Sequence, residues 1–186
     1  MSLHATASQT VGPYFQLGLK KLYKNNLGGA GEKIQIRGHV LDGDGKGVND
    51  AMLEIWQADS RGRYFHGEDQ PTKSSKTGFR RFGRVPTNEN GGFEIKTIKP
   101  GRVPGPGGLL QAPHIVVSVF ARGLLKQLIT RIYFPEGSEN PEDAILELVS
   151  SERRATLIAQ SVAGARGQFE WDVVLQGEDE TVFFDW

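Results

Sequence analysis

Alternating apolar residues, interrupted by short turns rich in glycine, limit most strongly what this chain can fold into. Residues 33–59 read KIQIRGHVLDGDGKGVNDAMLEIWQAD, in which two largely apolar runs flank the turn sequence DGDGKG. Alternation with a period of two places apolar side chains on one face of a β-strand, and Gly and Asp tolerate the backbone conformations of tight turns. Residues 88–101, NENGGFEIKTIKPG, repeat this arrangement. Both stretches predict β-strands joined by tight turns.

Further segments have the same character, and only one region favours helix. Strands are also expected in HIVVSVFA, QLITRIYF, QFEWDVVLQG and TVFFDW. Helix formers with early acidic residues are concentrated in PEDAILELVS and SERRATLIAQS, which begin at residues 141 and 151. We therefore predict an all-β protein, a β-sandwich of antiparallel strands with one or two short helices near the C-terminal third. The length of 186 residues suggests a single domain over residues 1–186, with residues 1–32 forming an N-terminal arm.

Charge and composition exclude several classes of protein. Lys and Arg together number 22, as do Asp and Glu, whereas proteins that bind nucleic acids or anionic membranes are usually basic. No apolar run approaches the roughly 18 residues of a membrane-spanning helix. The first residues, MSLHATASQT, lack the features of a signal peptide, and the absence of cysteine excludes disulfides and thiolate metal sites. We expect a cytoplasmic protein that binds neither nucleic acid nor membrane.

The residues alone offer few candidates for chemistry. Four histidines are present without the spacing of a zinc motif, and no P-loop, dinucleotide-binding or nucleophile-elbow motif occurs. His114 begins an alternating strand, but the next residue on the same face is Val116. His114 is thus a metal ligand, the remnant of one, or a buried structural histidine. Tyr64 follows a Ser-Arg-Gly turn, and composition alone favours an aromatic cap there. The segment SQTVGPYFQLGL at residues 8–19 either packs on a neighbour or lines a pocket.

Six segments, in order along nearly the whole chain, resemble the intradiol aromatic-ring dioxygenases. They are SQTVGPYFQLGL, LEIWQADSRGRY, FGRVPTNENGGFEIKTIKPG, APHIVVSVFARG, TRIYF and QGEDETVFFDW. The resemblance implies a β-sandwich fold. It also implies an enzyme family whose catalytic chains hold a non-haem Fe(III) with two tyrosines and two histidines, a donor set suited to that ion. These enzymes use O2 to cleave a catechol between its two hydroxyl-bearing carbons. The N-terminal arm and the final segment resemble the α type of chain more than the β type.

The family's metal ligands are only half retained in this sequence. The resemblance places the first tyrosine and the first histidine at Tyr64 and His114. Val103 and Val116 stand at the other two positions, and neither side chain can bind a metal. Gln111 stands where catalytic chains have an arginine. The resemblance therefore implies that this chain has no complete catalytic site and binds no metal. Tyr64 and His114 are vestigial, and the Fe(III) is held by a partner β chain.

The lost metal site leaves a second role open. In this family the α chains contribute an N-terminal arm and an arginine to a substrate pocket at the interface with the β chain. The matching positions are Thr10, Gly12, Pro13, Tyr14 and Arg122. The resemblance implies an α/β hetero-oligomer that acts on protocatechuate and O2. An arginine suits this substrate because its planar, permanently charged donor can face the ring carboxylate.

Other functions fit the same residues. One is a non-catalytic β-sandwich scaffold or binding module derived from the dioxygenase fold. A third function, with less support from the residues, is a self-contained dioxygenase with rearranged metal ligands. Without the resemblance, Arg122 would be assigned to a solvated turn.

Overall fold

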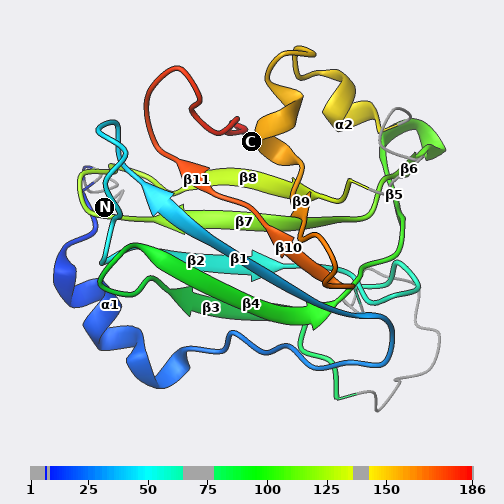
Figure 1. Ribbon diagram of the computed structural model, residues 1–186, viewed down its shortest axis with the longest axis horizontal. Helices are drawn as coiled ribbons and strands as arrows, with labels where there is room; N and C mark the ends of the chain where they lie inside the picture. The colour runs from blue at the N-terminus through cyan, green and yellow to red at the C-terminus, as the bar shows by residue number, and fades with distance from the viewer. Residues whose placement is uncertain (1–6, 8, 65–77, 136–142, 186) are drawn as a thin grey trace, which may run out of the picture.

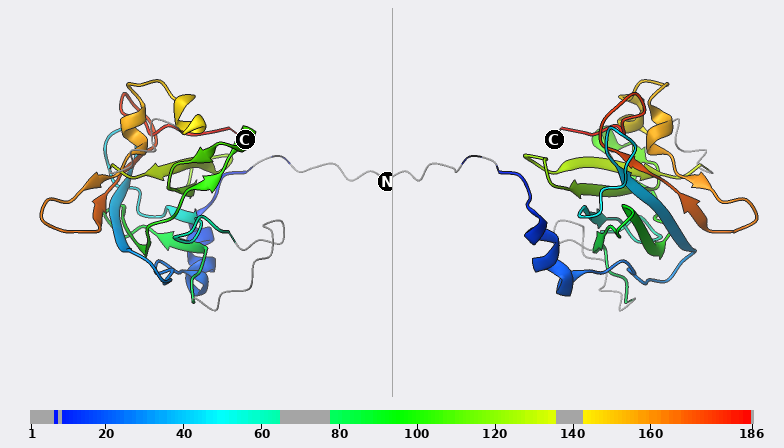
Figure 2. Two further views of the ribbon diagram at one scale, coloured as in Figure 1. Left: turned by 90° about the vertical axis from the view of Figure 1, so that its right-hand side faces the viewer. Right: turned by 60° about the vertical axis from the view of Figure 1, so that its left-hand side comes forward.

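The structure is a computed structural model of the chain, and it describes residues 7, 9–64, 78–135 and 143–185. Two β-sheets pack face to face (Figures 1 and 2). The strands are β1 (Lys33–Leu41), β2 (Met52–Trp56), β3 (Phe82–Pro86), β4 (Gly92–Ile98), β5 (Val103–Pro104), β6 (Leu110–Gln111), β7 (His114–Phe120), β8 (Leu128–Tyr133), β9 (Gln160–Ser161), β10 (Gln168–Glu170) and β11 (Val173–Val174). The α-helices are α1 (Pro13–Leu19) and α2 (Ala144–Glu147), and the 3-10 turns are η1 (Lys20–Leu22), η2 (Pro106–Gly108) and η4 (Arg154–Leu157).

The two sheets differ in their pairing. One has four antiparallel strands in the order β3-β2-β7-β8. In the five-stranded sheet, β1 pairs antiparallel with β4 on one side and parallel with β10 and β11 on the other. β9 pairs antiparallel with the outer edge of β10. β5 and β6 form a separate two-stranded ribbon. The predicted β-sandwich is confirmed, and α2 and η4 are its short helices in the C-terminal third. The parallel pairing of β1 is an addition to the prediction.

The core between the sheets fixes which side chains point outward. Ile36 and Ile95 from one sheet, and Leu53 and Val117 from the other, are fully buried in one apolar cluster. Burial of each such side chain contributes about 1.5–3 kcal/mol. Because β7 alternates, its core-facing Val117 puts His114, Val116 and Ser118 on the outer face of the four-stranded sheet.

The N-terminal arm contains a helix that the sequence analysis did not predict. Gly12 is the N-cap residue of α1, and Pro13 occupies its first turn, where proline needs no amide hydrogen and its fixed φ suits a helix. The ring of Phe15 stacks on Phe120 at the end of β7, with centroids 5.6 Å apart. This contact places α1 at the end of the sandwich where β7 terminates (Figure 1).

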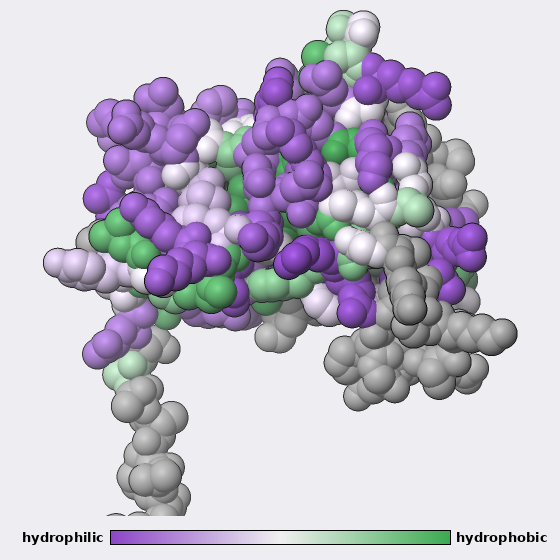
Figure 3. Space-filling model, turned by 90° about the horizontal axis from the view of Figure 1, so that it is seen from below, coloured by the Kyte–Doolittle hydropathy of each residue, from purple (hydrophilic) through white to green (hydrophobic). Residues whose placement is uncertain are grey.

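Hydrophilic residues dominate the face seen in Figure 3, and hydrophobic residues show between them. Within the described part of the chain, no helix combines the length and the apolar character needed to cross a bilayer.

Candidate functional site

His114 lies buried at the start of β7. Its side chain is 4% exposed, and it faces Tyr133 directly across the β7–β8 pair, with ring centroids 5.8 Å apart. The Nδ1 atom lies 2.8 Å from the carbonyl oxygen of Ala112. A carbonyl only accepts, so Nδ1 carries the proton in this contact and Nε2 keeps its lone pair. Burial, followed by the nearby charge of Arg131, lowers the pKa of His114 to about 4. The imidazole is therefore neutral at physiological pH.

The other three positions expected from the metal site lie around the same end of the sandwich. Tyr64 stacks on Trp56, with ring centroids 5.9 Å apart and planes 9° apart, and Trp56 pairs with Val116 across β2 and β7. Val103 is buried on β5, where it pairs with Gln111. The structure thus gathers these positions at one site, which we call the β7-start site, defined by Tyr64, Val103, His114 and Val116.

A buried arginine that the sequence analysis missed occupies the β7-start site. Arg131 pairs with Val116 across β7 and β8 and is 9% exposed. Its Nη1 donates to Gln111 Oε1 at 2.7 Å and to the hydroxyl of Tyr133 at 3.3 Å. The guanidinium therefore joins β8, beside Val116, to Gln111, the pairing partner of Val103.

A buried carboxylate completes this polar network. Asp143 is fully buried and caps α2 by accepting from the backbone of Ile145 and Leu146, each at 2.9 Å. It also accepts from the Ala112 amide at 2.7 Å and from the Tyr133 hydroxyl at 3.2 Å. Burial is the largest cause that raises the pKa of Tyr133, so its hydroxyl stays protonated and can donate.

The residues of the β7-start site do not fit a ferric ion. Val103 and Val116 supply no donor atoms, which leaves at most one phenol and one imidazole of the set that suits Fe(III). Arg131 already places a permanent positive charge there, and a second cation nearby would be repelled. Among the described residues, no group of three His, Asp or Glu side chains could hold a metal.

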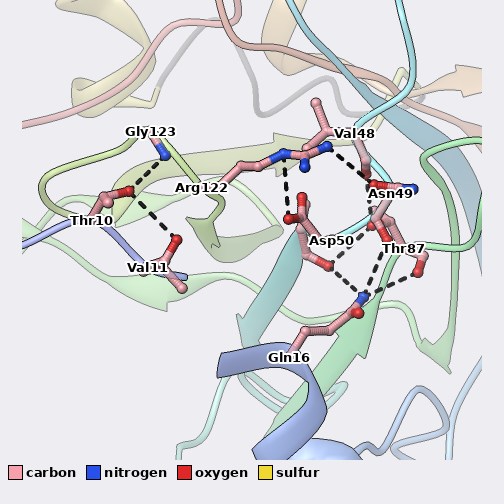
Figure 4. A network of polar contacts seen from close by, with 10 residues as sticks. Thr10, Val11, Gln16, Val48, Asn49, Asp50, Thr87, Arg122 and Gly123 are labelled. Atoms are coloured by element: carbon pink, nitrogen blue, oxygen red, sulfur yellow. Dashed lines mark hydrogen bonds and ion pairs between the residues drawn. The ribbon is translucent and has the colours of Figure 1, made fainter. Parts of the chain in front are cut away.

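The predicted pocket residues lie beyond the other end of β7, where Figure 4 shows Thr10 close to the turn of Arg122 and Gly123. Arg122 comes two residues after β7, eight positions beyond His114, which in extended chain corresponds to about 26 Å. Its side chain is 63% exposed, with Nε 3.4 Å from Asp50 Oδ2 and Nη2 3.3 Å from Asn49 Oδ1. The hydroxyl of Thr10 accepts from the Gly123 amide at 2.6 Å, so the arm lies beside Arg122.

The rest of the arm begins α1 next to this contact. Gly12 is exposed at the N-cap, Pro13 follows it, and Tyr14 is 82% exposed. The structure thus brings Thr10, Gly12 and Pro13–Tyr14 together with Arg122, and keeps them apart from Tyr64 and His114. It also adds three residues that the sequence analysis missed, Asn49, Asp50 and Gln16.

Comparisons with known proteins point to one group. A family model described as "Dioxygenase" matches residues 16–177. The chain is 43% identical to a protocatechuate 3,4-dioxygenase alpha chain from Burkholderia cepacia, over 99% of this chain and 98% of that protein. It is 34% identical to a protocatechuate 3,4-dioxygenase beta chain from the same species, over 81% of this chain and 67% of that protein. Among solved structures, the dioxygenase domain of a dioxygenase–carbohydrate-binding protein fusion from Streptomyces sp. SirexAA-E is similar, with a TM-score of 0.63 and 27% identity over 86% of this chain and 89% of that one.

Proposed function

Because this chain belongs to the intradiol dioxygenase family, we propose that it is the α subunit of an enzyme that cleaves protocatechuate with O2. In this proposal the product is 3-carboxy-cis,cis-muconate, and the enzyme is an α/β hetero-oligomer of the cytoplasm. The observation that carries the proposal is the 43% identity to an alpha chain over 99% of this chain. A scaffold without a role in catalysis would not need to keep similarity over the whole chain, including the N-terminal arm and the turn after β7 that carries Arg122.

The proposal assigns the ferric ion to the β chain. The valines and the buried guanidinium of the β7-start site support this assignment, because that site lacks donors and already contains a cation. The contribution of this chain is then a wall of the partner's pocket. Thr10, Gly12, Pro13 and Tyr14 would supply the arm side of that wall.

Arg122 would supply the charge of that wall. Its guanidinium is largely exposed, and among the described residues Nη1 has no partner. A guanidinium edge with donors to spare suits the carboxylate of protocatechuate, which it can bind by charge-assisted hydrogen bonds. Such a contact orients the ring and leaves its two hydroxyls for the partner's metal.

Co-expression with a β chain tests the proposal. The isolated chain should be colourless and contain far less than one iron per chain, whereas the co-expressed pair should consume O2 with protocatechuate. Metal analysis that found one tightly held iron in the isolated chain, lost in Tyr64→Phe, would contradict the assignment. A co-purified pair that contained iron but consumed no O2 with protocatechuate would contradict the substrate.

A further inference from the structure

Arg122 is held by one edge only, through a nearly buried carboxylate and the amide next to it. Asp50 lies in the turn between β1 and β2, and its side chain is 12% exposed. Its Oδ2 lies 3.4 Å from Arg122 Nε, while its Oδ1 is buried and has no hydrogen-bond partner among the described residues. A nearly buried carboxylate with no other hydrogen-bond donor is stabilised mainly by the positive charge beside it, so separating the two is costly. Asp50 therefore restrains where the guanidinium can point.

The neighbouring residue defines the orientation further. Asn49 Oδ1 accepts from Arg122 Nη2 at 3.3 Å, so Nε and Nη2 both face the turn that carries Asn49 and Asp50. The guanidinium is planar and presents its donors in a fixed fork. Once two of its nitrogens are engaged, the direction of Nη1 is set.

The same turn also fastens the arm. The side-chain Nε2 of Gln16 on α1 donates to the carbonyl oxygen of Asn49 in this turn at 3.4 Å. It also donates to the carbonyl oxygen of Thr87, just after β3, at 3.3 Å. At the other side of the Gly12–Tyr14 segment, Thr10 accepts from the Gly123 amide at 2.6 Å. The segment is thus anchored at both ends to residues adjacent to Asp50 and Arg122 (Figure 4).

We propose that Asp50 is a positioning residue for the reaction: it fixes Arg122 against the β1–β2 turn so that Nη1 faces the ring carboxylate of the substrate. This inference rests on the proposed function. The turn holds Arg122 and the arm in one preassembled arrangement, so little side-chain ordering is left for the moment of binding. Preorganisation of this kind strengthens binding because fewer rotamers are lost.

A double-mutant cycle in the co-expressed enzyme tests the inference. Asp50→Asn keeps the shape of the side chain and removes its charge. We expect it to lower kcat/KM for protocatechuate about tenfold, mainly through KM, because coupling energies between contacting residues commonly reach this size. In the Arg122→Ala background, Asp50→Asn should cause no further loss. Asp44→Asn is the matched control, since that carboxylate lies in the same β1–β2 connection but is 77% exposed.

The positioning role of Asp50 and the pocket role of Arg122 fail on different results. Equal losses in both backgrounds, or no loss from Asp50→Asn beside intact Arg122, would overturn the positioning role and leave that of Arg122 standing. No loss from Arg122→Ala itself would instead remove Arg122 from the proposed pocket.

A second variant keeps the test decisive if Asp50→Asn fails to assemble. Asn49 is exposed, so Asn49→Ala should preserve the fold. It should cost about threefold in kcat/KM, and this loss should disappear with Arg122→Ala. A loss that persisted there would count against the inference.

Discussion

Acidification should destabilise this chain through a single buried histidine. The pKa of His114 is lowered to about 4 in the folded protein, first by burial and then by the charge of Arg131, from its usual value of about 6.5. Above pH 6.5 the imidazole is neutral in both folded and unfolded chains and contributes nothing to the pH dependence. Below pH 6.5 the unfolded chain binds a proton that the folded chain refuses, so the free energy of unfolding falls as the pH falls.

The size of this effect follows from the two pKa values. Each pH unit below 6.5 lowers the free energy of unfolding by about 1.36 kcal/mol. At pH 5, about 1.5 units below, the loss is therefore about 2 kcal/mol. The loss levels off at about 3 kcal/mol below pH 4, where the folded protein also binds the proton.

Urea unfolding at several pH values between 7 and 5 measures the effect. His114→Gln removes the titrating group and retains a donor for the Ala112 carbonyl. Between pH 7 and pH 5 the free energy of unfolding of the native sequence should fall by about 2 kcal/mol more than that of this variant. Ile115→Val is the control, because a buried non-titrating change shifts stability by about 1 kcal/mol equally at every pH. A His114→Gln curve parallel to that of the native sequence would refute the reasoning.

Three further perturbations test other parts of the structure. Asp143→Ala removes the cap of α2 and leaves the buried Ala112 amide without an acceptor, which should cost about 2–4 kcal/mol in denaturant unfolding; a cost below about 0.5 kcal/mol, the range of ordinary surface changes, would contradict the network. Phe15→Ala should release α1 from Phe120, so that amides of α1 exchange hydrogen faster while those of β1 do not; unchanged exchange would show that the stacking does not hold the helix. Arg122→Ala in the co-expressed enzyme should impair turnover of protocatechuate more than assembly, as measured by O2 uptake and gel filtration; unchanged kinetic constants would remove it from the site.

The alternation of apolar residues predicted most of the long strands of the fold. It identified β1, β2, β4, β7 and β8 because each has a buried face and flanking turns. It could not show that β1 pairs in parallel with β10 and β11, since that choice depends on contacts between residues more than 100 positions apart. The helix α1 was also missed, although Pro13 after Gly12 was a usable signal for a helix start.

The candidate sites were predictable only where a resemblance supplied positions. Periodicity placed His114 and Val116 on one face, but an arginine in a strand usually faces solvent, so the burial of Arg131 could not be expected. Its burial depends on Gln111 and Tyr133, which meet it only in the folded chain. Asp143 directly before a helix-forming run was a local cap signal, whereas its bond to Ala112 was not visible locally. The proximity of Asp50 to Arg122 likewise arises from tertiary structure.

The central position of β1 has a consequence for how the chain is made. Its antiparallel neighbour β4 is synthesised soon after it, but its other edge is covered only by β10 and β11, which end at residue 174. Until those residues leave the ribosome, β1 exposes an unpaired edge that invites pairing with other nascent chains. Completion of the five-stranded sheet is thus a late, long-range event, and topologies of this kind fold slowly. The edge of β1 is therefore among the last parts of the sandwich to be covered.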